Sequence, residues 1–147
     1  MIRLLISLAG LLAVVPLRAD LAAVQAEPNL ERRAGKALDN ADRALKTAQE
    51  AYRNGYAQQS EAAFEELRES VVVANDSLKQ TGKNPSRSPK HFKRAEIRTR
   101  ALLRRLNDFR PQMSLEDREP LEKAEATIQK IHEELLAGIM GGKKKKR

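Results

Sequence analysis

The chain contains no cysteine and no tryptophan, and it has only two tyrosines and three phenylalanines. Without cysteine there can be no disulfide framework, no thiolate metal site, no acylation of a cysteine and no c-type haem attachment. Aromatic residues make up 3% of the sequence and charged residues 33%, a balance that disfavours a β-sandwich or a large enzyme. At 147 residues, the composition indicates one small, polar, helical domain.

Histidine is also scarce, and neither of the two histidines lies in a metal-binding pattern. His132 begins a stretch that resembles the zinc motif HExxH, but Leu136 stands where the second histidine ligand would be. Di-iron helical bundles use Glu-x-x-His, whereas Gln129 and Ser88 stand three positions before the two histidines. We therefore expect His132 to be a partly exposed surface residue. We also expect a non-enzymatic protein with no catalytic residue, metal or cofactor.

The amino terminus has the pattern of a secretion signal. Arg3 supplies a positive charge, and an apolar run follows from Leu4 to Leu17. This run is shorter than the about 20 residues of a membrane-spanning helix, and it suits a signal peptide; the alternatives are a buried core helix or an uncleaved anchor. Small side chains favour cleavage after Ala26, and cleavage after Ala19 is the second candidate. The sequence thus predicts a signal peptide over residues 1–26 and a periplasmic or secreted mature chain.

From Glu27 onward, apolar residues recur three or four positions apart, as is typical of amphipathic helices. Four such stripes follow one another. They comprise Leu30, Ala34, Leu38, Ala41, Leu45, Ala48 and Tyr52; Phe64, Leu67, Val71, Ala74 and Leu78; Phe92, Ala95, Leu102, Leu106 and Phe109; and Leu121, Ala124, Ile128, Ile131 and Leu135. Helix-breaking residues separate the stripes at 54–55, at 81–88 and at Pro111.

Short connections make successive helices antiparallel, so we expect an all-α, antiparallel up-down-up-down four-helix bundle over residues 27–142. Stretch 81–88 is the clearest linker and divides the bundle into two hairpins. An alternative is that the first two segments fuse into one long helix, because Gly55 alone costs a helix only about 1 kcal/mol. Ser88 is expected to cap the third helix and Ser114 the fourth.

The net charge is +8, and basic residues far outnumber acidic ones between Arg87 and Arg110. Part of this charge has expected partners: Asp39 with Arg43, Asp42 with Lys46, and Arg104, Arg105 and Arg110 with Glu116, Glu119 and Glu122. The bases at the start of the third helix have none, and each opposes the helix dipole at a cost of about 0.3–1 kcal/mol. Residues 143–147 add a polybasic tail.

These charges predict an exported, non-enzymatic protein that docks on an anionic envelope component: lipid, lipopolysaccharide, a cell-wall polymer or an acidic protein. The expected binding residues form a basic pole at one end of the bundle: Arg87, Lys90, Lys93, Arg94, Lys143, Lys144, Lys145, Lys146 and Arg147. The alternative function is a periplasmic helical chaperone or stress protein that uses grooves between helices. Nucleic acid is a disfavoured partner because few aromatic residues are available for base stacking.

Overall fold

The computed structural model describes residues 18–141 of the chain. Within this range the protein is all-α, without strands. Its elements are α1 (Arg18–Gln25), α2 (Leu30–Arg53), α3 (Ala57–Gln80), α4 (Lys90–Phe109) and α5 (Glu119–Met140), with 3-10 turns η1 (Arg110–Gln112) and η2 (Leu115–Asp117). The expectation of an all-α helical bundle is confirmed. The described residues form five α-helices instead of the four expected, and the additional helix is α1.

Helices α2 and α3 are separate, and the alternative of one long helix is wrong. Asn29 caps the start of α2, because its side chain accepts a hydrogen bond from the backbone N–H of Arg32 at 2.9 Å. After α2, Gly55 has a φ of +79°, which a residue with a Cβ atom rarely adopts. The chain reverses there, and α3 packs along α2.

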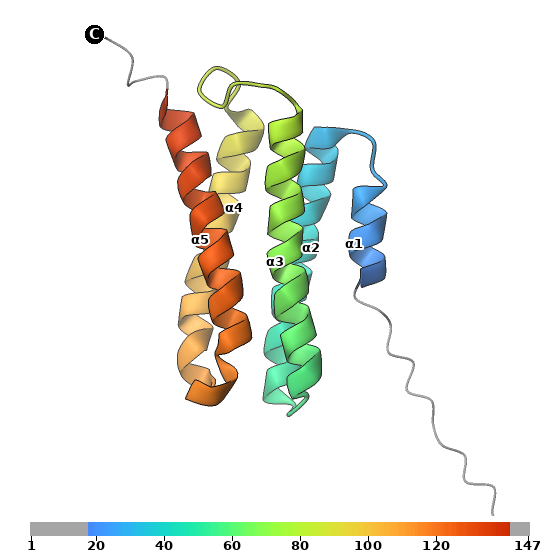
Figure 1. Cartoon of the computed structure of the whole chain (residues 1–147), viewed down its shortest axis with the longest axis vertical. Coiled ribbons are helices and arrows are strands. Elements are labelled where there is room, and N and C mark those ends of the chain that lie inside the picture. Colours follow the sequence, from blue (N-terminus) through green and yellow to red (C-terminus); the bar gives the residue numbers. More distant parts are fainter. Residues whose placement is uncertain (1–17, 142–147) are drawn as a thin grey trace, which may run out of the picture.

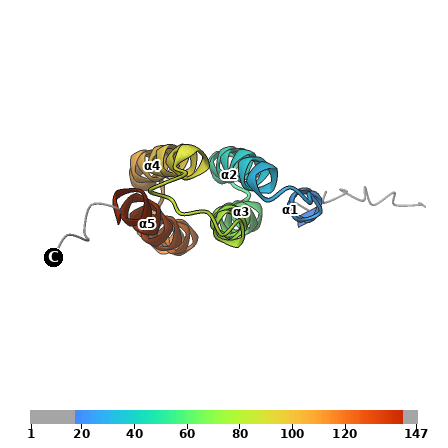
Figure 2. The same ribbon diagram turned by 90° about the horizontal axis from the view of Figure 1, so that it is seen from above.

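Helices α2 to α5 follow the long axis of the molecule and are joined alternately at its two ends (Figure 1). Seen from above, the α2–α3 pair lies beside the α4–α5 pair, and α1 lies outside the α2–α3 pair (Figure 2). All five helices contribute to one hydrophobic cluster. Every residue of the four predicted stripes is buried except Leu30 and Tyr52, which are partly exposed.

Two helix starts differ from the expected positions. Helix α4 starts at Lys90 with Pro89, and not Ser88, at the cap position, so it has no side-chain cap. Ser88 belongs to the preceding turn, where its N–H donates to the carbonyl of Asn84. Helix α5 starts only at Glu119, after η2. It also continues through Gly138, where an added Cβ would lie 3.2 Å from Pro85, so this glycine lets α5 pass close to the α3–α4 loop.

Helix α1 comes from the segment expected to be removed with the signal peptide. Its Leu21 and Val24 are only 6% and 5% exposed and belong to the hydrophobic cluster. Two contacts with α2 stabilise the turn after α1. The carbonyl of Glu27 accepts a hydrogen bond from Arg33 Nε at 2.8 Å, and the Glu27 carboxylate pairs with Lys36 at 2.6 Å. The apolar run from Leu4 to Leu17 lies outside the described residues.

A small polar cluster is buried between α2 and α3. Asn40 Nδ2 donates to Glu66 Oε1 at 3.0 Å and to Ser70 Oγ at 2.9 Å. The other carboxylate oxygen of Glu66 is buried and has no hydrogen-bond partner within residues 18–141. Burial raises the pKa of Glu66, the bond from Asn40 lowers it, and the charge of Asp20 raises it again. Asp20 belongs to α1, which contacts α3, the helix that carries Glu66.

Candidate functional site

The starts of α2 and α4 and the ends of α3 and α5 lie at the same end of the molecule (Figure 1). Four of the expected binding residues are at this end, in the turn before α4 and in its first turns: Arg87, Lys90, Lys93 and Arg94. All four are exposed, and none has a carboxylate oxygen within 4 Å in the described part of the chain. The other five, Lys143 to Arg147, lie outside the described residues; α5 ends at Met140 at this end.

Most of the remaining bases at this end are paired with acidic side chains, and Arg33 donates to the backbone carbonyl of Glu27. Lys36 and Arg32 lie 2.6 and 3.6 Å from the Glu27 carboxylate, Lys79 lies 3.2 Å from Glu134, and Lys83 and His91 both contact Glu31, the latter at 2.9 Å. Hydrogen bonds from Lys36, Lys83 and Lys79 lower the pKa of Glu27, Glu31 and Glu134, respectively. These carboxyl groups are therefore ionised at neutral pH, and the unpaired positive charge is concentrated on the four residues around the start of α4.

The bases farther along α4 do not pair as expected with residues 116, 119 and 122. Arg98 contacts Asp42 and lies 2.7 Å from Asp39, and Arg105 lies 3.4 Å from Asp42, so both reach across to α2. The expected pairs of Asp39 and Asp42 within α2 are absent from the described contacts, because these carboxylates face α4 instead. Arg110 pairs with Glu125 on α5.

Arg104 differs from these arginines, because it is exposed and has no carboxylate within 4 Å in residues 18–141. It belongs to the side of α4 that points away from the bundle, which we call the outer face. The outer face comprises Lys90, Lys93, Arg94, Ile97, Arg100, Ala101 and Arg104, all exposed. Arg100 has a partner, Glu96, at 3.5 Å, and Asp108 is the acid at the far end of this face.

Sequence reasoning assigned Arg104 to pairing and passed over Ile97, which is 54% exposed. The signal for both was present, since residues three or four positions apart share a helix face. Ile97 follows Lys93 and Arg94 at such spacings, and Arg104 follows Arg100 and Ala101.

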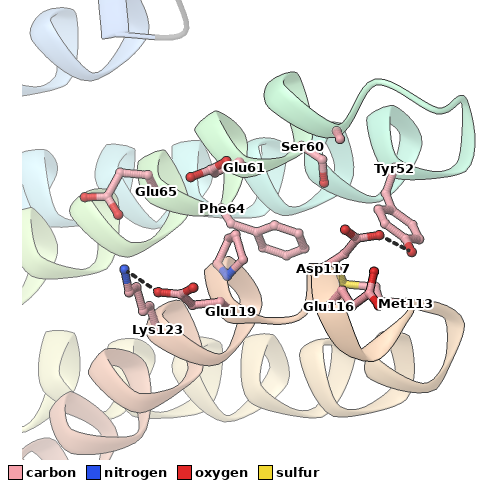
Figure 3. Close-up of a pocket in the computed structure, with 12 residues that line it drawn as sticks. Tyr52, Ser60, Glu61, Phe64, Glu65, Met113, Glu116, Asp117, Glu119 and Lys123 are labelled. Atoms are coloured by element: carbon pink, nitrogen blue, oxygen red, sulfur yellow. Dashed lines mark hydrogen bonds and ion pairs between the residues drawn. The ribbon is translucent and has the colours of Figure 1, made fainter.

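A pocket of about 380 Å³ lies at the opposite end, between the start of α3, η2 and the start of α5 (Figure 3). Its lining includes five carboxylates: Glu61, Glu65, Glu116, Asp117 and Glu119. Tyr52 donates to Asp117 at 3.1 Å, and Lys123 lies 3.0 Å from Glu119 (Figure 3). Arg68 lowers the pKa of Glu65, and Glu119 raises the pKa of Lys123. Both groups therefore keep their charge at neutral pH, and neither is tuned for proton transfer.

His132 is partly exposed, as expected. It lies between α4 and α5, with Nδ1 3.1 Å from Thr99 Oγ1, and its side chain is only 13% exposed. Within residues 18–141, no group of three or more acidic or histidine side chains is arranged to hold a metal ion.

Comparisons with protein-family models, with curated proteins and with solved structures find no match to this chain. Among the described helices, none combines the length and the apolar character needed to cross a bilayer.

Proposed function

We propose that this protein is exported and docks on an anionic envelope component through the basic pole. The observation that supports this most directly is the group of unpaired, exposed bases at the start of α4: Arg87, Lys90, Lys93 and Arg94. Folding does not account for them, because Lys90, Lys93 and Arg94 lie at the positive end of the helix dipole, where each cation costs about 0.3–1 kcal/mol.

An antiparallel up-down-up-down arrangement of α2 to α5 strengthens the pole. In this arrangement the start of α4 and the end of α5 share one end of the bundle. The polybasic tail, residues 143–147, follows α5 in the sequence. Each lysine or arginine near an anionic membrane surface adds about 1 kcal/mol of binding free energy. The folded surface and the tail together provide nine such residues.

Binding to vesicles of neutral lipid with and without added anionic lipid tests this proposal. We expect binding only to the anionic vesicles, and weaker binding at high salt because the Debye length falls from about 10 Å at 0.1 M to about 3 Å at 1 M. The double substitution Lys90→Gln and Lys93→Gln should weaken binding about thirtyfold. The matched control is Lys46→Gln with Lys123→Gln, which removes two exposed lysines elsewhere. Equal losses in both variants, or salt-independent binding, would contradict the proposal.

Export with cleavage is the second part of the proposal. The burial of Leu21 and Val24 supports cleavage after Ala19 over cleavage after Ala26, because a chain that begins at Asp20 keeps these two side chains in the hydrophobic cluster. Mass spectrometry of the envelope fraction should find a mature chain that begins at Asp20. Full-length protein in the cytosol would contradict export, and a chain that begins at Glu27 would show that α1 is dispensable.

A helical chaperone is the second candidate function, and the pocket between α3 and α5 is the observation that favours it. Its carboxylates suit a segment of basic polypeptide. A chaperone should suppress the aggregation of a basic client protein. If Glu61→Gln with Glu119→Gln weakens this suppression and Lys90→Gln with Lys93→Gln leaves it unchanged, the chaperone is favoured over the docking protein.

A further inference from the structure

We infer that the anionic partner is a lipid bilayer and that the protein lies on it side-on, with the outer face of α4 against the headgroups and Ile97 inserted among them. This inference rests on the proposed function of the basic pole. It adds the chemical class of the partner, the orientation of the bundle and a contact residue that carries no charge.

The positions of the bases along α4 favour the side-on orientation. At 1.5 Å per residue, the distance from Lys90 to Arg104 along the helix axis is about 21 Å. A flat anionic surface laid along this face meets Lys90, Lys93, Arg94, Arg100 and Arg104 at once. The same surface at the end of the bundle meets the bases around the start of α4 and the paired bases Arg32, Lys36, Lys79 and Lys83, but it misses Arg100 and Arg104. Asp108, the acid on this side of α4, lies beyond the last of these bases.

Ile97 favours a bilayer over a purely polar anion. It lies near the middle of the outer face, and its helical neighbours three and four positions away are Lys93, Arg94, Arg100 and Ala101. A single exposed aliphatic side chain is common on protein surfaces. At a lipid interface, however, an apolar side chain enters the boundary between headgroups and acyl chains while flanking bases reach the phosphates. A soluble polyanion offers contacts to the bases but no apolar layer for Ile97.

The flank of α4 that faces α2 takes no part in this surface. Arg98 and Arg105 are turned toward Asp39 and Asp42 and held there. Arg104 and Arg105 are therefore neighbours in sequence with different surroundings, one unpaired on the outer face and one paired with α2. This contrast supplies a matched pair of substitutions.

Tryptophan fluorescence tests the insertion, because the chain has no tryptophan of its own. Ile97→Trp should give a blue shift on addition of vesicles that contain anionic lipid and none with neutral vesicles or with soluble polyglutamate. The control is Leu115→Trp, which replaces an aliphatic side chain that is 80% exposed at the other end of the bundle. The emission of Leu115→Trp should not shift with anionic vesicles, neutral vesicles or polyglutamate.

Affinity for the same vesicles tests the orientation. Arg104→Gln should weaken binding about fivefold, while Arg105→Gln should change it by less than about twofold. One set of results would overturn this inference alone: the emission of Ile97→Trp does not shift, both arginine variants bind like the parent, and Lys90→Gln with Lys93→Gln still abolishes binding. The protein would then dock end-on, and the proposed function would stand. If the parent protein binds polyglutamate but no anionic vesicles, the lipid partner is wrong while the proposed function stands. If it binds neither, the proposed function fails as well. A blue shift with polyglutamate would overturn the assignment of a lipid partner.

Discussion

Substitution of Glu66 by glutamine is expected to stabilise the fold at neutral pH. The Glu66 side chain is 4% exposed, with one carboxylate oxygen bonded to Asn40 at 3.0 Å and the other without a partner in the described chain. A buried polar group without a partner costs about 1–3 kcal/mol, and more when it is charged. Glutamine keeps the size and the bonded oxygen and removes the charge. Because its amide nitrogen then takes the unpartnered position, we expect a gain at the lower end of that range, about 1 kcal/mol.

The stabilisation by Glu66→Gln should increase as the pH rises. The pKa of Glu66 is raised above its value in the unfolded chain, chiefly by burial. The stability that Glu66 contributes is therefore fully present below the unfolded pKa, about 4.3, and is lost as the pH rises through the folded pKa. The advantage of Glu66→Gln should thus be large at pH 7 and small at pH 4. Urea denaturation of both proteins at the two pH values measures it.

Two results would refute this reasoning: a Glu66→Gln protein less stable than the parent at pH 7, or a difference between the two that does not change with pH. A chain that begins at Glu27 provides a further check. It lacks α1 and with it Asp20, one of the charges that raise the pKa of Glu66. The advantage of the substitution should be smaller in that chain.

Two further predictions concern the core and the backbone. Leu106 is fully buried, so Leu106→Ala should lower the free energy of unfolding, measured by urea denaturation, by about 2–5 kcal/mol. The circular dichroism spectrum at low urea should remain helical. A loss of stability below about 1 kcal/mol would show that Leu106 is not a core residue. Gly55→Ala should destabilise by about 1–2 kcal/mol because of its positive φ, whereas Gly35→Ala, within α2 and with no atom within 4 Å of the added Cβ, should stabilise by about 0.5–1 kcal/mol. Effects of the same sign at both glycines would contradict the assigned turn.

The core could be predicted from the sequence because burial in helices follows a local rule. Leu38 and Leu106, for example, are buried as their spacing of three to four residues from other apolar positions predicted. Helix α1 could not be predicted from this spacing. Its two buried residues, Leu21 and Val24, give one interval and no repeat, and the small side chains between and after them also fit a signal cleavage region.

Ion pairs were harder to predict because their partners come from other helices. The rule of positions four apart offers Asp39 a partner on its own helix, Arg43, but the carboxylate meets Arg98 on α4 at 2.7 Å. Which flank of α4 faces α2 is decided by packing of the whole bundle. The unpaired position of Lys90 was predictable, because no acidic residue lies within four positions of it in the sequence. Lys93 has Glu96 three positions later, but that carboxylate lies near Arg100 and His132 instead. That these lysines bind an anionic surface stays a prediction.

The basic residues of α4 separate into two groups by their angle around the helix. Arg98 and Arg105 stabilise the contact with α2, whereas Lys90 and Lys93 oppose the helix dipole and contact no carboxylate in the described chain. If the second group exists for a partner, its removal should have opposite effects on two measurements. The variant with Lys90→Gln and Lys93→Gln should be slightly more stable than the parent while it binds anionic vesicles less tightly. A residue kept for folding lowers stability when it is removed, so this opposition distinguishes a binding surface from a structural one on the same helix.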